Sequence, residues 1–254
     1  MLNTKKYGSG RPLIFVHGFC EDSSMWEGFC EPFIDQHEVF LVDLPGFGKS
    51  SLPSKDFTIE EIADQLAQWM KSLKINNAIV IGHSLGGYVI LELVKKYPEL
   101  IEGFGLFHST AFVDTEEKRD TRNKVIEFVE ENGVEFFADS FVPQLFYTKN
   151  RKRLATEIEQ AVNTARQTPL ETLVGYTKAM RDRNDRTDVL KSFDGPVLFI
   201  AGDQDTSVPL DKSEKQIPMI QKGVTGILQN TGHMGMFEAK GVSQQLIHEF
   251  LSLR

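Results

Sequence analysis

The sequence predicts an α/β fold built on a doubly wound, mostly parallel sheet. Short apolar runs recur along the chain, and stretches with helical periodicity separate them. Near-continuous apolar strands are typical of parallel sheets that helices cover on both faces. With 254 residues, of which 41% are hydrophobic and 25% charged, the chain can bury a sizeable core without disulfides.

The first third of the chain supplies three of these strands. They are expected at residues 12–16, 38–44 and 77–82. Residues 58–74 carry apolar side chains at three- and four-residue spacing, and Thr58 and Glu61 form a capping-box pattern at their start. We therefore expect a helix over 58–74 and a second helix directly after the third strand.

Beyond residue 100, the sequence predicts one more strand, then a long helical segment, and then two further strands. Further strands are expected at 101–108, 195–203 and 224–230. Residues 110–190 are highly charged, have helical periodicity and contain no convincing strand. We interpret them as a helical cap inserted into a core formed by residues 1–109 and 191–254. A long pair of ordinary crossover helices is the alternative.

Composition excludes several classes of partner. A net charge of -8 and a pI near 5.3 argue against nucleic acid or an anionic membrane. The two cysteines, Cys20 and Cys30, make no disulfide framework, and no Cys/His cluster has zinc spacing. The N-terminal residues lack the apolar core of a signal peptide, and no apolar run is long enough to span a membrane. We expect a cytoplasmic protein.

One serine stands where a strand gives way to a helix. The stretch VIGHSLGGYV, residues 80–89, places Ser84 between Gly82 and Gly86. A sharp turn there would lift the hydroxyl above the sheet, and bulkier neighbours would clash with the strand and the helix. A serine hydroxyl becomes a useful nucleophile only beside a base. The alternative is that Ser84 is an ordinary turn serine. The presence of a base and of oxyanion donors elsewhere in the chain distinguishes the two.

The loop after the first long strand could complete such a site. The segment FVHGF, residues 15–19, ends that strand. Two backbone N–H groups must stabilise the negative oxygen that forms in acyl transfer, one of them following the nucleophile. We assign them to Phe19 and Leu85. His17 is interpreted as a structural residue that holds the loop.

The base and its carboxylate partner are expected downstream. The stretch FIAGDQDTSVP delivers Asp203 and Asp205 after a strand, and NTGHMGMFE places His233 on a glycine-bounded loop. The chain order of serine, then aspartate, then histidine is the order that accompanies a nucleophile elbow. This order favours a nucleophilic role for Ser84.

The chain resembles the α/β-hydrolase superfamily along nearly its whole length. The matching segments are HGF (17–19), DLPGFGKS (43–50), GHSLGG (82–87), AGDQD (201–205) and GH (232–233). The resemblance implies that Ser84 is acylated, that His233 acts as base and then as acid, and that Asp205 rather than Asp203 orients it. It also implies a cap that roofs an apolar pocket, and an edge strand near residues 2–7 with the family's first strand missing.

The GFGKS segment and four possible pocket side chains each allow a functional and a structural interpretation. GFGKS looks like the tail of a phosphate-binding loop, but Asp43 stands where that loop needs glycine, so a structural turn is expected. Four side chains are candidates for a substrate pocket: His83, Phe141, Phe146 and Met234. Burial against the neighbouring strands is the favoured interpretation for His83, since alternate side chains leave a strand in opposite directions, and packing within the cap applies to the Phe residues as well.

The function predicted from these features is a carboxylesterase-like serine hydrolase. It would cleave small to medium apolar esters through an acyl-enzyme, with neither metal nor organic cofactor. A C–C bond hydrolase and a cofactor-free haloperoxidase or perhydrolase would use the same three residues. A ligand receptor that retains the pocket is a third possibility from another class.

Overall fold

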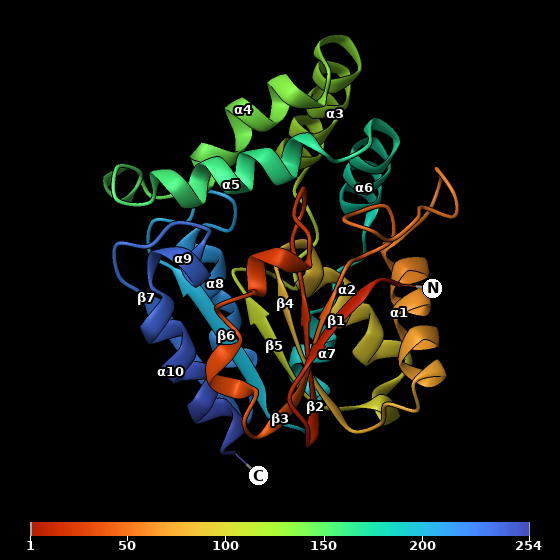
Figure 1. Cartoon of the computed structure of the whole chain (residues 1–254), viewed down its shortest axis with the longest axis vertical. Coiled ribbons are helices and arrows are strands. Elements are labelled where there is room, and N and C mark those ends of the chain that lie inside the picture. Colours follow the sequence, from red (N-terminus) through yellow and green to blue (C-terminus); the bar gives the residue numbers. More distant parts are fainter. Residues whose placement is uncertain (1, 254) are drawn as a thin grey trace.

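The computed structural model describes residues 2–253, which form a seven-stranded sheet covered by helices (Figure 1). The strand order is β1-β3-β2-β4-β5-β6-β7, and β1 alone runs antiparallel to its neighbour. The strands are β1 (Thr4–Tyr7), β2 (Arg11–Val16), β3 (His37–Val42), β4 (Ala78–His83), β5 (Ile101–Phe107), β6 (Val197–Gly202) and β7 (Gly223–Leu228). The edge strand expected near residues 2–7 is β1, and the mostly parallel sheet is confirmed.

Helices alternate with the strands, as the periodicity predicted. They are α1 (Ile59–Ser72), α2 (Leu85–Lys96), α3 (Glu116–Asn132), α4 (Val134–Leu145), α5 (Ala155–Arg166), α6 (Leu170–Asp182), α7 (Thr187–Ser192), α8 (Leu210–Gln216), α9 (Gly235–Glu238) and α10 (Lys240–Leu251). The capping box of α1 is present: the Glu61 N–H donates to Thr58 Oγ1 at 3.2 Å, and the Thr58 N–H donates to Glu61 Oε2 at 2.9 Å. None of the helices within residues 2–253 combines the length and the apolarity needed to cross a bilayer.

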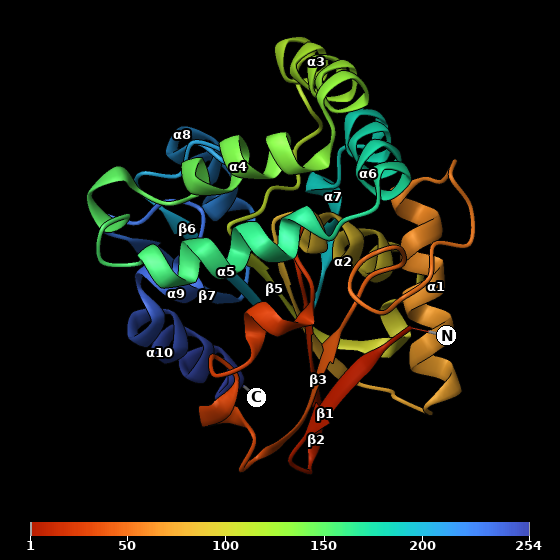
Figure 2. The same cartoon turned by 45° about the horizontal axis from the view of Figure 1, so that its top comes forward.

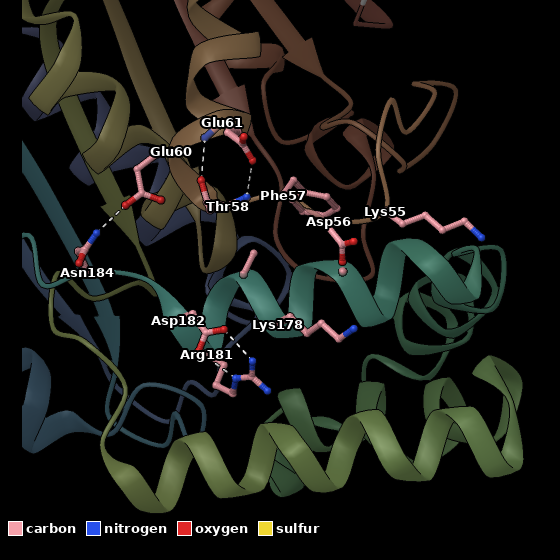
Figure 3. Close-up of a pocket in the computed structure, with 12 residues that line it drawn as sticks. Lys55, Asp56, Phe57, Thr58, Glu60, Glu61, Lys178, Arg181, Asp182 and Asn184 are labelled. Atoms are coloured by element: carbon pink, nitrogen blue, oxygen red, sulfur yellow. Dashed lines mark hydrogen bonds and ion pairs between the residues drawn. The ribbon is translucent and has the colours of Figure 1, made fainter.

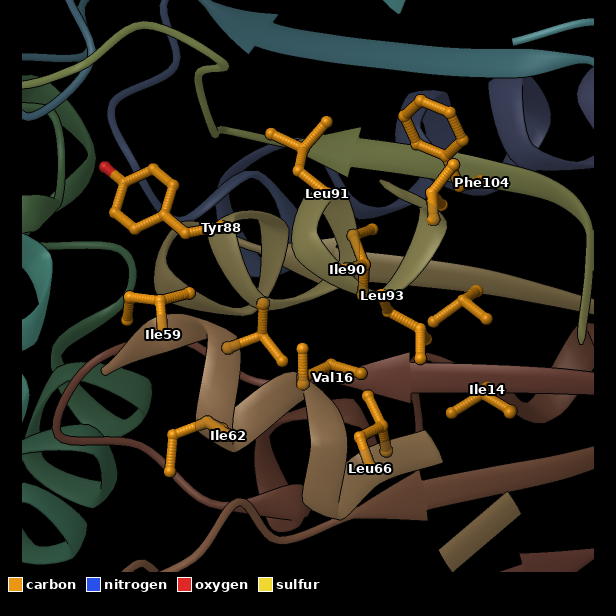
Figure 4. Close-up of a cluster of buried hydrophobic side chains, with 14 of the residues drawn as sticks. Ile14, Val16, Ile59, Ile62, Leu66, Tyr88, Ile90, Leu91, Leu93 and Phe104 are labelled. Carbon is orange, nitrogen blue, oxygen red and sulfur yellow. The ribbon is translucent and has the colours of Figure 1, made fainter. Parts of the chain in front are cut away.

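Alternate side chains of each central strand enter two separate cores. In β2, Ile14 and Val16 pack with residues of α1 and α2, as Figure 4 shows. Leu13 and Phe15 point to the opposite face, where they pack with an aromatic cluster and with α10. Because successive side chains of a strand point to opposite faces, burial on both sides fixes the register of the sheet.

Four helices, α3 to α6, are inserted between β5 and β6. Figures 1 and 2 show them together above one end of the sheet, the end at which the parallel strands terminate. We call α3 to α6 the inserted helices. In parallel α/β sheets, ligand sites form at this end because the loops that follow the strands converge there.

The turn after β3 is structural, as expected. The Asp43 carboxylate accepts hydrogen bonds from the N–H groups of Ser23 at 2.8 Å and Lys49 at 2.9 Å. Gly48 has a φ of +54°, and a Cβ there would lie 2.4 Å from Asp43 Oδ2. The GFGKS segment therefore braces the edge of the sheet instead of cradling a phosphate.

Candidate active site

Ser84 occupies a strained turn between β4 and α2. Its φ of +49° is rare for a residue with a side chain. The flanking glycines permit this turn: a Cβ on Gly82 would lie 2.4 Å from the Gly86 carbonyl carbon, and a Cβ on Gly86 would lie 2.6 Å from the carbonyl oxygens of β2 and His17. Ser84 is part-exposed, whereas the residues on both sides of it are buried. The hydroxyl is therefore carried at the first turn of α2, where the helix dipole favours negative charge.

Asp205 and His233 meet beside this turn. The loop after β6 carries Asp205, and the loop after β7 carries His233. The His233 ring donates from Nδ1 to Asp205 Oδ2 at 2.7 Å, and its centroid lies 4.8 Å from that of His83, the residue before Ser84. The other carboxylate oxygen, Oδ1, accepts from the N–H groups of Ser207 at 2.8 Å and Val208 at 2.9 Å.

A second histidine, which the sequence analysis did not single out, binds the same carboxylate. His108 follows β5 with a φ of +49° and donates from Nδ1 to Asp205 Oδ2 at 3.1 Å. Its side chain is fully buried, and its Nε2 has no hydrogen-bond partner among the described residues. Nε2 faces the backbone of Gly235, where a Cβ would approach it to 2.3 Å. The sequence did offer one signal for His108: it is a polar residue at the end of a predicted parallel strand, where ligand sites form.

These contacts set the charge states of the pair. Burial would raise the pKa of Asp205, but the charge of His233 and the hydrogen bonds from both histidines outweigh it and hold that pKa well below its usual range. Burial lowers the pKa of His108 to about 4, against the opposing effect of Asp205. At neutral pH, Asp205 is therefore ionised and His108 is a neutral donor.

The hydroxyl of Ser84 and the two proposed oxyanion donors make no hydrogen bonds within residues 2–253. No hydrogen bond within residues 2–253 joins Ser84 Oγ to the His233 ring, and such bonds are often loose before substrate binds. The N–H groups of Phe19 and Leu85 donate to no acceptor in this part of the chain. By contrast, the Gly18 N–H is taken up by Glu21 Oε2 at 2.6 Å. The geometry leaves free the two donors that the sequence assigned.

A buried ion pair connects the loop around Gly18 to the loop of His233. His83 Nδ1 lies 3.0 Å from Glu21 Oε2, and its Nε2 lies 3.0 Å from the His233 carbonyl oxygen. Both partners are acceptors, so both ring nitrogens carry hydrogen and the ring is positively charged. Burial disfavours that charge, yet Glu21 outweighs it and raises the pKa of His83.

The inserted helices are fastened to the His233 loop by a second carboxylate. Glu238 Oε1 accepts from the N–H groups of Gly232 at 3.0 Å and Met234 at 3.2 Å. Its Oε2 accepts from the N–H of Tyr147, just after α4, at 2.8 Å. The His233 N–H donates directly to the carbonyl of Leu145, the last residue of α4, at 2.7 Å. The end of α4 therefore helps to position the loop that carries His233.

Three further polar residues have structural positions. His17 is fully buried, with Nδ1 2.8 Å from the Gly18 carbonyl oxygen and Nε2 accepting from the Leu44 N–H at 2.9 Å. Asp203 accepts from the Thr231 N–H at 3.1 Å and so braces the loop that precedes His233. Burial raises the pKa of the Cys20 thiol, which disfavours its reactive thiolate form.

Three of the four expected pocket residues are buried in this structure. His83, Phe146 and Met234 are exposed by 0%, 1% and 1%, close to the 3% of His233, and their contact with a substrate stays a prediction. His83 is held in its ion pair, and Phe146 stacks on Phe237 with ring centroids 6.1 Å apart. Phe141 is part-exposed and lies edge-on to Phe19 at 6.2 Å. Packing between loops and helices, which periodicity does not encode, removed the others from solvent.

One group within residues 2–253 has the spacing of metal ligands, and it is the histidine–aspartate cluster itself. One ligand atom each from His108, Asp205 and His233 lie within 4.8 Å of one another. A zinc ion would sit about 2.0–2.2 Å from each such atom and would replace the two hydrogen bonds that now join them. The direct hydrogen bonds fit an acid–base assembly better.

Several cavities open beside the inserted helices, and two of them lie against α6 and α3, respectively. The larger, of 710 Å³, opens between the start of α1 and α6. Figure 3 shows charged groups in its wall that are already engaged, including Arg181 with Asp182 and Asn184 with Glu60. The smaller, of 280 Å³, lies between the start of α3 and the loop of Asp205. The smaller one adjoins the candidate site.

The chain is similar to several solved structures over nearly its full length. An esterase from Thermogutta terrifontis, solved with malate bound, is 29% identical with a TM-score of 0.92, covering 98% of this chain and 92% of that one. The enol-lactonase of Burkholderia xenovorans has a TM-score of 0.90 at 20% identity, covering 99% and 96%. A bromoperoxidase from Bacillus anthracis has a TM-score of 0.86 at 20% identity, covering 98% and 94%. At 20% identity, the last two likenesses show the fold alone.

Sequence relatives match over shorter regions. The 2-(acetamidomethylene)succinate hydrolase of Mesorhizobium japonicum is 30% identical over 115 residues, which are 45% of this chain and 41% of that protein. The chain thus matches less than half the length of this curated relative. A family model for the alpha/beta hydrolase fold matches residues 11–240. The chain therefore belongs to the α/β hydrolase fold family.

Proposed function

We propose that the protein is a carboxylesterase-like serine hydrolase that cleaves small to medium carboxylic esters through an acyl-enzyme. The observation that carries this proposal is the convergence of Ser84, in its strained turn, with the His233–Asp205 hydrogen bond of 2.7 Å at one end of the sheet. The similarity to a solved esterase supports the same reaction class.

In the proposed mechanism, Ser84 Oγ attacks the ester carbonyl carbon and its proton passes to His233 Nε2. The oxygen of the tetrahedral intermediate becomes negative and accepts hydrogen bonds from the N–H groups of Phe19 and Leu85. The alcohol leaves with the proton from His233. Water then attacks the acyl carbon and gives a proton to His233, which passes it to Ser84 Oγ as the bond to the acyl group breaks and the acid leaves. Asp205 holds the tautomer of His233 in which Nδ1 carries the hydrogen.

The inserted helices, within residues 110–190, would act as a cap over this site. Their contacts with the site support that role: Phe141 meets Phe19, and the end of α4 binds the His233 loop. The core would then be residues 1–109 and 191–254. No metal or organic cofactor takes part in the steps above, because each proton and each charge is handled by a named group of the chain.

Initial rates on p-nitrophenyl esters from acetate to decanoate test the proposal. We expect steady turnover in the wild type and a loss of about 10⁴-fold or more in Ser84→Ala. Turnover that survives in Ser84→Ala would overturn the nucleophile assignment. A wild type that is inactive on every ester would favour the two alternative reactions, C–C bond hydrolysis and perhydrolysis. Activity on a diketone would identify the first, and activity with peroxide, as the similarity to a bromoperoxidase suggests, would identify the second.

A further inference from the structure

The 280 Å³ cavity is walled by immediate neighbours of the proposed catalytic residues. Tyr88 lies one turn of α2 beyond Ser84, and Thr206 and Ser207 directly follow Asp205. The Ser207 N–H itself donates to the Asp205 carboxylate at 2.8 Å. A ligand group in this cavity would therefore lie against the loop of Asp205 and beneath the first turns of α3, one turn of α2 away from Ser84.

The cavity wall is rich in hydroxyl groups, and its buried acid is already neutralised. Five threonine and serine residues contribute to it: Thr110, Thr115, Thr121, Thr206 and Ser207. The Asp114 carboxylate pairs with Arg122 at 2.6 Å and with Arg183 at 2.7 Å. The other acid of the wall, Glu117, is exposed. The Thr121 hydroxyl already donates to the Glu117 carbonyl oxygen at 2.9 Å, whereas the other four donate to no acceptor within residues 2–253 and can donate to an incoming anion. Asp114, with two guanidinium partners, repels such an anion little.

Lys118 supplies a cation without a carboxylate partner. It forms no ion pair within residues 2–253, and its Nζ reaches only the Ser207 carbonyl oxygen, at 3.4 Å. Its side chain is part-buried on the first turn of α3, and Lys212 adds a second ammonium to the wall. Burial and the nearby guanidinium groups lower the pKa of Lys118, whereas Asp114 and Asp205 act to raise it. A carboxylate bound there would stabilise the ammonium form.

We propose that this cavity binds an ionised carboxylate carried by the ester substrate, with Lys118 as its principal cation. The inference rests on the proposed function of Ser84 and narrows its substrate class to esters of short dicarboxylic acids or of short hydroxy acids. A volume of 280 Å³ suits such a short charged arm, and the hydroxyls around Lys118 supply the remaining donors that a carboxylate needs.

Matched ester pairs test the proposal. Monoethyl glutarate and ethyl pentanoate differ in one terminal group, as do 3-acetoxypropanoate and propyl acetate, which place the charge on the alcohol side. We expect wild-type kcat/KM to favour the charged member of at least one pair. Lys118→Met should lower the charged-to-neutral ratio of kcat/KM for that pair by about 10- to 100-fold, the range for a hydrogen bond to a charged group.

Lys178→Met is the matched control. Lys178 is exposed on α6, another inserted helix, and lines the other cavity. The charged-to-neutral ratio should not change in this variant. If the ratio is the same in wild type, Lys118→Met and Lys178→Met while the esters are hydrolysed, the carboxylate site is refuted and the serine hydrolase stands.

A binding measurement decides the case in which no ester is hydrolysed. Glutarate is not an ester, so its Kd from calorimetry is independent of turnover. We expect Kd to rise about 10- to 100-fold in Lys118→Met. Equal Kd values in wild type and Lys118→Met would refute the site, whatever the function of Ser84. A weakened Kd without ester hydrolysis would support the carboxylate site and refute the proposed reaction.

Discussion

On the sheet side of the candidate site, the contacts are hydrogen bonds to one carboxylate: Asp205 accepts two from ring nitrogens and two from backbone N–H groups, all between 2.7 and 3.1 Å. On the side of the inserted helices, the end of α4 makes backbone hydrogen bonds to the His233 loop, and the side chains around Phe19 make aromatic contacts. Phe19 meets Phe137 and Phe141 with ring centroids 6.3 and 6.2 Å apart. Both sets of contacts lie at the end of the sheet where the parallel strands terminate, which is also where β4 leads into Ser84.

The two kinds of contact constrain the site differently. Hydrogen bonds are directional and weaken steeply with angle, so the sheet side fixes the positions of proton donors and acceptors. Aromatic contacts tolerate several offset geometries and contribute through buried area. We therefore expect substitutions on the sheet side to change kcat, and substitutions on the inserted helices to change which substrates fit.

The largest expected effect is on Asp205. Asp205→Asn removes the charge that stabilises the His233 imidazolium and favours the wrong tautomer, so kcat should fall about 10³- to 10⁴-fold. The matched control is Asp203→Asn. Asp203 accepts one backbone N–H, and an amide oxygen can do the same, so we expect a loss of less than about 10-fold. Initial ester rates and melting temperatures of both variants check this, and a reversed order would move the catalytic role to Asp203.

The second effect is on stability, through the Glu21–His83 pair. His83→Gln leaves the buried Glu21 without its charged partner and should lower the free energy of unfolding by about 3 kcal/mol. The pKa of His83 is raised, so its contribution is present below its ordinary pKa of 6.5 and is lost as pH rises through the folded value. The pKa of Glu21 is lowered, so its contribution is present above 4.5 and is lost as pH falls through the folded value.

The difference between wild type and His83→Gln should therefore be greatest between pH 4.5 and pH 6.5. Urea denaturation of both proteins at roughly pH 5.5 and roughly pH 9 measures it. A difference that is constant with pH, or that grows at alkaline pH, would show that His83 acts through packing alone.

The third effect concerns His108, the second donor to Asp205. His108→Leu removes that hydrogen bond from a buried carboxylate and should lower kcat about 10-fold, with little change in KM. His108→Gln keeps an N–H donor and should recover part of the rate. Steady-state kinetics of the two variants separate the roles, because equal losses would assign His108 to packing.

The fold was predictable, and the main candidate site residues could be proposed, because their signals are local. The helix expected over 58–74 is α1, Ile59–Ser72, with Thr58 as its N-cap. A serine between glycines marks a strand-to-helix turn, because few other sequences allow it. The chain order of serine, then aspartate, then histidine narrowed the candidates for the base and its carboxylate to His233 and Asp205.

The rest of the site depends on contacts between distant segments. His108 and Asp205 are 97 residues apart, and Glu21 and His83 are 62 apart. Neither pair has a local pattern that would reveal it. The environment of Phe146 depends on such a contact too, since it stacks on Phe237, 91 residues away in sequence.

The smallest effect tests the inserted helices. Phe141 is part-exposed, stacks on Phe137 at 4.8 Å and lies next to Phe19, so Phe141→Ala should enlarge the space above the proposed oxyanion donors. We expect Phe141→Ala to hydrolyse p-nitrophenyl esters of longer acyl chains best. Its kcat on the acetate should change less than about threefold, because no hydrogen bond to Ser84, Asp205 or His233 is lost. Phe136→Ala on the same helix is the control, since Phe136 is 69% exposed and should leave the chain-length profile unchanged. If Phe141→Ala instead lowers kcat on every ester equally, the aromatic contacts of α4 position the proposed catalytic groups, as the hydrogen bonds at its end do, and do not select the substrate.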